Sequence, residues 1–591
     1  MRHMLPMLLL CTLIGSAAAQ PVDPLPANLP STPESVVLVD LLSDYQADRR
    51  AVSSFYGMSF DTHALDRLEA LHTEAAERLA ATDFAALDQQ GKIDFLLFRT
   101  KLESQAAGLV LARARLEEMR PLIPFAETIA ALERDRVAMR PIDFAKVAAT
   151  LDLLDDEIKA IRARIDKGRK DDNTDQQAED DDRLIVSPVL AQRTAGTLRE
   201  MARTLNSWFG YSDGYKPEFG WWVSAPFADA HKALSDYADY LRKTVAGIEG
   251  KDDDPLLGDP IGREKLLADL RAEWIPYTPE ELIAIAEREF AWCEAEMRNA
   301  AREMDLGDDW QAALEQVKQD HAPPGEQDEL VASLARESID FLTERDMVTI
   351  PPLAAELWRL EMIKPRNQRT HPFAFYGGNY MGIAYPTDEM SHGDKLMSMR
   401  GNNRHFTRAI VHHELIPGHH LQGFIAKRER PYRRAFSTPF LFEGWCLYWE
   451  MVLYDAGFAH SPEDRIGMLF WRMHRCARII VSLKFHLGEM SPDEMVEFLV
   501  ERVGHERSNA TAEVRRYIGS SYSPLYQAAY MLGGLQLREL RRELVETGTM
   551  TERAFHDAVL SHNAIPVELI RASLTGSELT PETQTSWRFG E

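Results

Sequence analysis

Apolar residues recur at three- and four-residue steps along most of this 591-residue chain, and this periodicity constrains its fold more than any other feature. Between about residues 35 and 165 it is carried by segments such as LDRLEALHTEAAERLAA. It pauses at the charged segment 167–183, which has almost no apolar residue and is typical of a solvated loop. A helix start is marked at Thr278, which is the expected N-cap: Pro279 is the first helical residue, and Glu281 completes a capping box. The pattern predicts a mainly α-helical protein.

One segment, Phe373 to Pro386, departs from the helical pattern and reads FAFYGGNYMGIAYP. It is rich in glycine and tyrosine and has no charged residue. Such a composition predicts one or two short strands with a bend at Gly377 and Gly378. We therefore expect a small β region near residues 373–386 within an otherwise helical chain.

The first residues have the layout of a secretory signal peptide. A short basic start precedes an apolar run from Leu5 to Ile14, and small residues then precede Gln20. Lipidation at Cys11 is disfavoured because Leu10 stands where a lipid-attachment site has a small residue. No later segment holds 18 uninterrupted apolar residues. We expect residues 1–19 to be removed, and the rest to be periplasmic or secreted without stable membrane insertion.

The remaining chain, residues 20–591, has neither a low-complexity linker nor a fixed-period repeat. We expect a single large unit with two lobes around a deep cleft. The N-terminal lobe is predicted at about residues 35–345 and the catalytic lobe at about 350–580. The sequence leaves the oligomeric state open.

Charge and cysteine content exclude some classes of function. The net charge of −26 repels phosphate backbones, so we expect no nucleic acid partner. The three cysteines beyond the predicted signal peptide have no Cys-x-x-Cys spacing, so they predict buried thiols rather than a zinc knuckle. A disulfide between Cys446 and Cys476 stays open.

The segment His412–His420 reads HHELIPGHH and carries the strongest chemical signal. Zinc hydrolysis needs three protein ligands, an open position for water and a base beside that water. The commonest sequence form is H-E-x-x-H on a helix. Four histidines and a glutamate between apolar flanks predict a metal site, because burying them without a metal would leave many polar atoms to satisfy.

The spacing leaves the pairing of the histidines ambiguous. His413 and His419 are six residues apart, which on a continuous helix separates them by roughly 120°. A bulge at Pro417–Gly418 would bring them together, because proline disrupts the preceding turn and glycine adopts unusual backbone angles. On a straight helix, His413 with His420, or His412 with His419, would share a face.

A third ligand is expected from the following helix, FLFEGWCLYWEMVLYDAGF. It offers Glu443 and Glu450, two carboxylates that need partners in an apolar setting. Glu443 lies 24 residues beyond His419, which is enough for a turn and an antiparallel return. The alternative is a buried salt bridge of Glu443 with Arg433, Arg434 or Arg475.

These motifs resemble the successive landmarks of the bacterial family called domain of unknown function 885. The matching segments are VHHELIPGHHLQ, FLFEGWCLYWE, EVRRYI and YQAAYMLGG. The family is placed among zincin-like metallopeptidases, which implies a large helical zincin-like fold with zinc as cofactor. The resemblance implies His413, His419 and Glu443 as ligands and Glu414 as general base.

The C-terminal motif departs from the family pattern. Tyr526 stands where a glutamine is expected, whereas Tyr530 matches. We expect Tyr530 to donate to the oxyanion that forms during hydrolysis. Arg516, Tyr517 and His505 are the alternative oxyanion donors. Substrate contacts are expected from Arg516 and Tyr517, and from Gly378 and Tyr380 beside an extended substrate.

We therefore expect a zinc-dependent hydrolase, specifically a peptidase that cleaves short peptides with Glu414 as general base. The alternatives are a metallohydrolase for another amide or ester, or a periplasmic binding protein with a structural zinc. Residues 210–214 match the G-x-S-x-G nucleophile elbow, but a helical pattern precedes them where that motif needs a strand. Substrate identity and end preference stay open.

Overall fold

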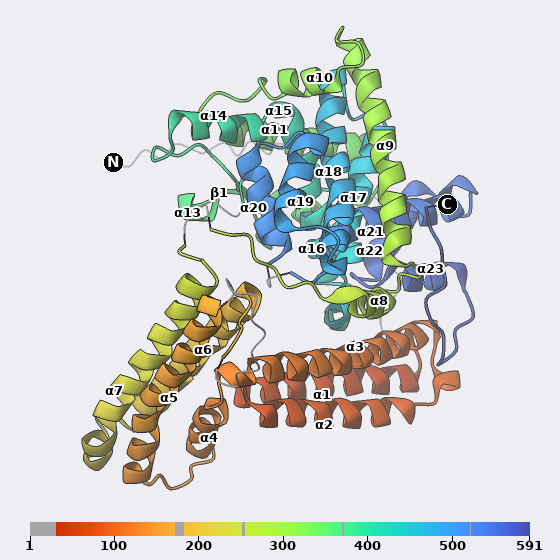
Figure 1. Cartoon of the computed structure of the whole chain (residues 1–591). Coiled ribbons are helices and arrows are strands. Elements are labelled where there is room, and N and C mark those ends of the chain that lie inside the picture. Colours follow the sequence, from red (N-terminus) through yellow and green to blue (C-terminus); the bar gives the residue numbers. More distant parts are fainter. Residues whose placement is uncertain (1–30, 172–182, 251–253, 369–370, 520–521, 591) are drawn as a thin grey trace, which may run out of the picture.

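The computed structural model describes residues 31–171, 183–250, 254–368, 371–519 and 522–590. Its elements are helices apart from one small three-stranded sheet, so the predicted mainly α fold is confirmed. Figure 1 shows three parts: a layer of three helices, an arm that projects from it, and a larger body that contains the rest of the chain. The predicted signal peptide lies outside the described residues.

The layer is formed by the first three helices, which lie side by side beneath the body (Figure 1). They are α1 (Pro33–Phe55), α2 (Thr62–Ala80) and α3 (Gln89–Met119). Helix α3 joins the two hydrophobic cores of the molecule. Its first turns, up to Leu102, pack into the core of the body, whereas Leu116 and Met119 belong to the core of the arm.

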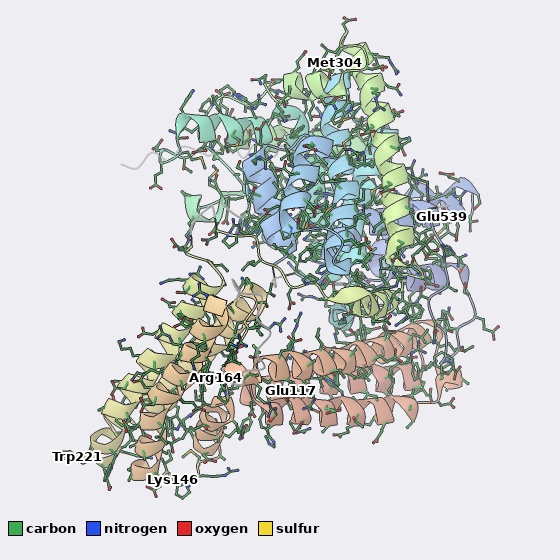
Figure 2. The ribbon with its side chains drawn as sticks, in the orientation of Figure 1. Glu117, Lys146, Arg164, Trp221, Met304 and Glu539 are labelled. Carbon is green, nitrogen blue, oxygen red and sulfur yellow. The ribbon has the colours of Figure 1, made fainter. Side chains whose placement is uncertain are left out.

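The arm is a bundle of four helices with its own core. The helices are α4 (Ala126–Val137), α5 (Phe144–Asp171), α6 (Pro188–Ser212) and α7 (Pro217–Asp239). Trp221 lies at the free end of the arm and is 84% exposed (Figure 2). The G-x-S-x-G match falls on the last turn of α6 and the loop after it, so the strand that a nucleophile elbow requires does not precede it.

The body holds the remaining helices around one large core. They are α8 (Gly262–Ala272), α9 (Pro279–Glu303), α10 (Trp310–Val317), α11 (Gln327–Glu344), α12 (Pro352–Leu357), α13 (Pro365–Gln368), α14 (His392–Gly401), α15 (Arg404–Glu414), α16 (His419–Ala426), α17 (Pro439–Asp455), α18 (Pro462–Leu487), α19 (Pro492–Phe498), α20 (Arg507–Tyr517), α21 (Tyr526–Arg541), α22 (Glu552–Ser561) and α23 (Val567–Thr575). Helix α9 begins at the predicted capping box of Thr278 and Glu281.

The two cores divide at a different place from the predicted lobe boundary near residues 345–350. The core of the arm ends at Ala246 and that of the body resumes at Leu266, so α8 to α11 pack with the C-terminal helices. Helix α9 in particular packs along α18. Periodicity marks the buried face of each helix but does not say which helix covers it, and this is why the boundary differs.

The sheet contains β1 (Leu360–Met362), β2 (Ala374–Tyr376) and β3 (Met381–Ile383) in the order β1-β3-β2. Strand β3 is parallel to β1 and antiparallel to β2. Strands β2 and β3 form the hairpin predicted within residues 373–386. Strand β1 was not predicted, because three residues are too few to show an alternating pattern. Strand β2 is an edge of the sheet.

No helix in the described part of the chain has the length and apolar character that crossing a membrane requires.

Candidate metal centre

The histidine-rich segment is divided between two helices. Helix α15 ends at Glu414, α16 begins at His419, and a turn joins them where a bulge was expected. The turn is anchored by hydrogen bonds from Ser338 Oγ to the Ile416 carbonyl and from Trp445 Nε1 to the Pro417 carbonyl, each 2.8 Å long. The break brings the rings of His413 and His419 to a centroid separation of 5.1 Å.

Gly418 makes this break possible because it has no side chain. A Cβ atom at this position would lie 1.7 Å from the carbonyl oxygen of His413, so no side chain fits there. The Gly418 amide donates to the His412 carbonyl over 2.9 Å, and the His420 amide donates to the Leu415 carbonyl over 3.0 Å. The chain therefore folds back on the end of α15 and starts α16 beside it.

Three atoms from three helices converge at this point. Glu443 on α17 places Oε2 3.2 Å from Nε2 of His419 and 3.5 Å from Nε2 of His413. Ligand atoms about 2.0–2.1 Å from a tetrahedral zinc are about 3.3 Å apart. Glu443 Oε2 is buried and accepts no hydrogen bond of normal geometry within the described residues, although both imidazoles are close. Two imidazole nitrogens and a carboxylate oxygen, at these two distances from the carboxylate oxygen, are a donor set that suits a zinc ion.

The other polar atoms of these three residues already have partners. His413 donates from Nδ1 to Glu450 Oε1 over 2.6 Å. His419 Nδ1 lies 3.3 Å from Cys446 Sγ, and the thiol in turn faces the Phe442 carbonyl. Tyr526 donates its hydroxyl proton to Glu443 Oε1. Each residue is thus oriented so that its remaining atom points to the common centre, as metal ligands are in proteins.

The imidazoles and carboxylates of this cluster shift one another's pKa values. Burial alone would lower the pKa of His413, but the carboxylates of Glu443 and Glu450 raise it to about 9. Burial alone would raise the pKa of Glu443, but the imidazoles of His419 and His413 hold it well below its usual range. A carboxylate that stays ionised at neutral pH suits a cation site.

The two outer histidines are directed elsewhere. His412 is fully buried against Phe458, neither ring nitrogen has a hydrogen-bond partner among the described residues, and burial lowers its pKa to about 4. His420 donates from Nε2 to the Ala354 carbonyl over 2.9 Å, and its Nδ1 lies 3.2 Å from the Tyr376 hydroxyl. The geometry therefore favours His413 with His419 over either straight-helix pairing.

Cys446 is the other residue close enough to be considered as a ligand, because ligand atoms of His413, His419 and Cys446 lie within 4.8 Å of one another. Its sulfur faces Nδ1 of His419, on the opposite side of the ring from Glu443. Only the thiolate binds metals well, and burial followed by the charge of Glu443 raises the pKa of this thiol well above its usual value. We assign Cys446 to orienting His419.

The sequence left open a disulfide between Cys446 and Cys476. Cys446 and Cys476 are free buried thiols, as is Cys293. No disulfide therefore links α17 to α18.

A cavity of about 240 Å³ opens beside the three converging atoms. Glu414 lines it, is half-buried, and has no hydrogen-bond or ion-pair partner among the described residues. Tyr530 and Arg516 also line it. A deep cleft between two lobes was expected, but this cavity lies within the body alone.

Three predicted substrate contacts are placed outside this cavity. Gly378 lies at the tip of the β2–β3 hairpin, where its carbonyl accepts a hydrogen bond from Lys427, and the Tyr380 ring packs against Gly377 and Phe375. Tyr517 is buried behind the cavity and donates to Glu513 over 2.6 Å. The hairpin contributes instead through β2, because Ala374, Phe375 and Tyr376 line the cavity.

A close helix contact places Tyr526 and Tyr530 beside Glu443. Helices α17 and α21 cross so closely at Gly444 and Gly533 that a Cβ atom on Gly444 would lie 2.6 Å from the Cα atom of Gly533. Gly444 follows Glu443 directly and Gly533 lies three residues after Tyr530, and both Glu443 and Tyr530 line the cavity. The glycines of the E-G-W and M-L-G-G motifs therefore allow the two helices to approach at the candidate site.

Several residues of the cavity were not predicted from the sequence. They are Tyr376, Arg475, Arg478, Glu513, Tyr522 and, as a partner of Glu443, Tyr526. For Arg475 and Arg478 the signal was available, because charged residues at buried positions of an apolar helix such as α18 need partners. Tyr526 was set aside because it departs from the family pattern.

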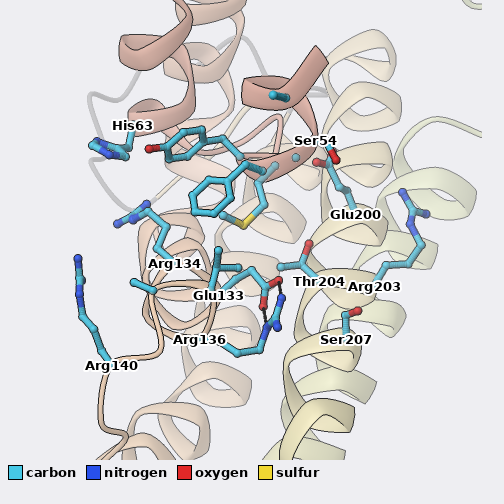
Figure 3. Close-up of a pocket in the computed structure, with 17 residues that line it drawn as sticks. Ser54, His63, Glu133, Arg134, Arg136, Arg140, Glu200, Arg203, Thr204 and Ser207 are labelled. Carbon is cyan, nitrogen blue, oxygen red and sulfur yellow. Dashed lines mark hydrogen bonds and ion pairs between the residues drawn. The ribbon is translucent and has the colours of Figure 1, made fainter. Parts of the chain in front are cut away.

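A larger cavity of about 940 Å³ lies at the junction of the layer and the arm (Figure 3). Its charged side chains are mostly paired with one another or with neighbours. Arg136 pairs with Glu133 over 2.5 Å, Arg134 pairs with Asp61 over 2.6 Å, and Glu200 accepts from the Ser59 amide over 2.7 Å. No cluster of metal-ligand residues occurs there in the described chain, so the smaller cavity is the candidate site.

Comparisons with known proteins place this architecture. The fold resembles two solved structures, "a putative lipoprotein of unknown function from Shewanella oneidensis" and "the putative lipoprotein from Colwellia psychrerythraea". The first has a TM-score of 0.66 at 16% identity and covers 91% of this chain and 99% of its own. The second has a TM-score of 0.56 at 17% identity and covers 92% and 99%. No curated protein matches the chain.

A family model described as "Bacterial protein of unknown function (DUF885)" matches residues 58–574. This match covers α2 and α3 of the layer, the arm, and the body up to residue 574, including every residue of the candidate metal centre. The chain therefore belongs to the DUF885 family.

Proposed function

We propose that this protein is a zinc-dependent hydrolase that cleaves short peptides. The observation that carries the proposal is the buried Oε2 atom of Glu443, which has no hydrogen bond of normal geometry and lies 3.2 and 3.5 Å from two imidazole nitrogens. His413, His419 and Glu443 would hold the zinc ion. When bound in such a site, zinc lowers the pKa of a water molecule to about 7 and polarises a carbonyl.

Glu414 is the proposed general base. It follows His413 directly in sequence, lines the cavity, and has no partner in the described structure that would occupy its carboxylate. It would take a proton from water as the oxygen bonds to the scissile carbonyl carbon. The same proton then goes to the leaving nitrogen as the C–N bond breaks. A structural metal site needs no such free carboxylate.

Tyr530 is the proposed donor to the oxyanion. Its ring stacks on that of His413 with a centroid separation of 6.1 Å, and its hydroxyl makes no hydrogen bond within the described residues. Burial, with the charge of Glu443, raises the pKa of Tyr530, so the hydroxyl keeps its proton at neutral pH. A protonated donor at this position can stabilise the negative charge of a tetrahedral intermediate.

A peptide is favoured over other amides and esters by the edge of the sheet. Strand β2 pairs with β3 on one side only, and Ala374, Phe375 and Tyr376 line the cavity. An extended peptide recognises such an edge through backbone hydrogen bonds, which a small ester or amide cannot form in series.

The test is a metal assay combined with a peptide-library digest of the purified protein. We expect about one zinc per chain, with cleavage that a chelator stops and added zinc restores. Zinc without cleavage of any peptide, amide or ester would favour a structural-zinc protein instead. Cleavage of small esters or amides but not of peptides would favour the other metallohydrolase.

We also propose that the protein acts in the periplasm or outside the cell. The layout of residues 1–19 supports this location, as do the names of the two structurally similar proteins. Protein isolated from its native cell should begin at or near Gln20, and soluble cytoplasmic protein that retains Met1 would contradict the proposal.

A further inference from the structure

Three arginines line the same cavity as the candidate metal centre. Arg475 and Arg478 lie on α18, and Arg516 lies on α20. The guanidinium carbons of Arg475 and Arg478 are 4.8 and 4.7 Å from the ring centroid of Tyr530. Because this ring also stacks on His413, the arginines lie close to the metal centre but beyond its ligands.

Their positive charge is only partly balanced by protein carboxylates. Arg478 and Arg516 share one oxygen of Glu513, with N–O distances of 2.8 and 2.7 Å. Arg475 makes no hydrogen bond within the described residues, and its contact with Glu450 is 3.9 Å long. Glu450 is itself engaged by His413. Two of the three guanidinium groups therefore share one carboxylate, and the third has only the long contact with Glu450.

The neighbouring histidines do not change this balance. His474 and His505 lie against each other beside Glu513, with 2.9 Å between their nearest ring nitrogens. Burial lowers the pKa of His474 well below its usual value and that of His505 to about 3, so both are neutral at pH 7.

Each arginine also keeps a buried nitrogen without a hydrogen-bond partner among the described residues: Nε of Arg475, Nη1 of Arg478 and Nε of Arg516. The side chains of Arg475 and Arg478 are only 8% and 4% exposed. Burying a charge is costly unless it is paired and hydrogen-bonded. A group of three buried guanidiniums that line a cavity is thus suited to an anion brought by a ligand.

We propose that Arg475, Arg478 and Arg516 bind the free α-carboxylate of a peptide substrate, so that the protein removes short fragments from the C-terminus. The inference rests on the proposed function, whose substrate end it specifies. The planar guanidinium matches a carboxylate with two parallel hydrogen bonds. At about 240 Å³ the cavity is smaller than the about 300–1,000 Å³ typical of ligand sites, which suits the end of a chain better than its middle.

The position of the arginines limits the length of the fragment. The ring of Tyr530 lies against both His413 and the guanidinium groups of Arg475 and Arg478. An extended residue spans about 3.3–3.6 Å, so the α-carboxylate lies within a few residues of the scissile bond. An acidic side chain carries the same chemistry, and the experiment separates it from the chain terminus.

The experiment measures binding to the full-length Glu414→Gln protein, in which substrate is not consumed. The probes are acetyl-Ala-Ala-Ala with a free C-terminus, its C-terminal amide, and acetyl-Ala-Ala-Asp amide, each titrated by calorimetry with zinc and after chelation. We expect the free acid to bind at least about tenfold more tightly than either amide, as a charge-assisted bidentate pair implies. The preference should persist without metal, since the arginines do not need it.

Arg475→Gln tests the assignment with little structural loss, because Arg475 makes no hydrogen bond in the described structure. It should reduce the preference for the free acid by about tenfold or more, and Arg475→Lys should restore part of it. Arg465→Gln, on the same helix but paired with Glu303 at the surface, is the matched control and should leave the preference unchanged. If Arg475 instead contacted the oxyanion, Arg475→Gln would lower the turnover of free-acid and amide peptides equally.

The outcomes separate this inference from the proposed function. Equal binding of the acid and both amides, or equal cleavage of acid and amide peptides by the parent protein, would overturn the inference while leaving a peptidase intact. Preference for the aspartyl amide over the free acid would overturn it in favour of a side-chain subsite. If the free acid binds more tightly but the parent hydrolyses no peptide, the carboxylate subsite would be supported and the proposed catalytic function would be contradicted.

Discussion

Glu450 accepts a hydrogen bond from Nδ1 of His413 over 2.6 Å, and this contact fixes the ring so that Nε2 faces Glu443. Glu443 and Glu450 lie on the same helix, seven residues apart, and both are buried. One carboxylate thus faces the candidate metal centre and the other orients a proposed ligand. The pair of acidic residues in the apolar α17 helix has a different task at each position.

Changing Glu450 to glutamine should weaken zinc binding without removing the site. The amide cannot stabilise the Nδ1 proton of His413 as a carboxylate does, and loss of such a partner typically lowers metal affinity by about 10–100-fold. Competition with a chelator of known affinity measures the change. Glu489→Gln, an exposed carboxylate change at the end of α18, is the control. Unchanged zinc affinity in Glu450→Gln would show that the contact is not needed for binding.

Alanine substitutions should separate the four histidines into two pairs. His413→Ala and His419→Ala should lose zinc, because each removes one of three ligands. His420→Ala and His412→Ala should retain about one zinc per chain, because their rings point to other partners. Metal analysis after dialysis measures the content, and circular dichroism checks folding. Loss of zinc from His420→Ala but not from His419→Ala would contradict the pairing.

The sequence predicted the residues of the candidate metal centre better than the residues that line the cavity around it. His413, His419, Glu443 and Glu414 are all marked by type and motif, and the structure brings them together. What could not be predicted is contact between helices distant in sequence. The position of Arg478 relative to Tyr530, for example, depends on how α18 crosses α21.

In the fold too, local features were predicted from the sequence, whereas contacts between distant helices were not. Helical periodicity, the capping box at Thr278 and the strand region at 373–386 were visible in the sequence, because each is a local property. The assignment of α9 to the core of the body was not, because its apolar face would suit either lobe equally well. Gly378 and Tyr380 were expected at the site for a similar reason: the hairpin was predicted, but not which of its residues face inward.

Gly444→Ala should destabilise the protein and disturb zinc binding together. The new methyl group would lie 2.6 Å from the Cα atom of Gly533, and such overpacking typically costs about 1–3 kcal/mol. Denaturant unfolding and zinc titration measure the two effects. Gly108→Ala, in the middle of α3, places its new methyl group more than 4 Å from any atom beyond its chain neighbours and its own helix backbone, and should instead stabilise by about 0.5–1 kcal/mol. Similar behaviour of both variants would contradict the close packing of α17 and α21.

The pH dependence of stability should include a contribution from Glu273, whose carboxylate is bonded by the Thr438 hydroxyl at the start of α17. Burial raises the pKa of Glu273 to about 7 from its usual 4.5, so the folded state favours the protonated form. This contribution is complete below pH 4.5 and is lost as the pH rises to about 7. Glu273→Gln, which stays neutral, should be more stable than the parent at pH 8 by about 1–3 kcal/mol and similar to it at pH 5. Unfolding curves that keep a constant offset from pH 5 to pH 8 would exclude the effect.

The most direct test of the central claim is the parallel measurement of zinc content and peptide hydrolysis in Glu414→Gln. Glutamine keeps the size of the side chain but cannot take a proton, and general acid–base catalysis typically contributes about 10²–10⁴ in rate. We predict parent levels of zinc and a loss of hydrolysis of at least that size, while Glu489→Gln hydrolyses peptides at the parent rate. Glu414→Gln protein that binds zinc and hydrolyses peptides as fast as the parent would contradict the proposed mechanism.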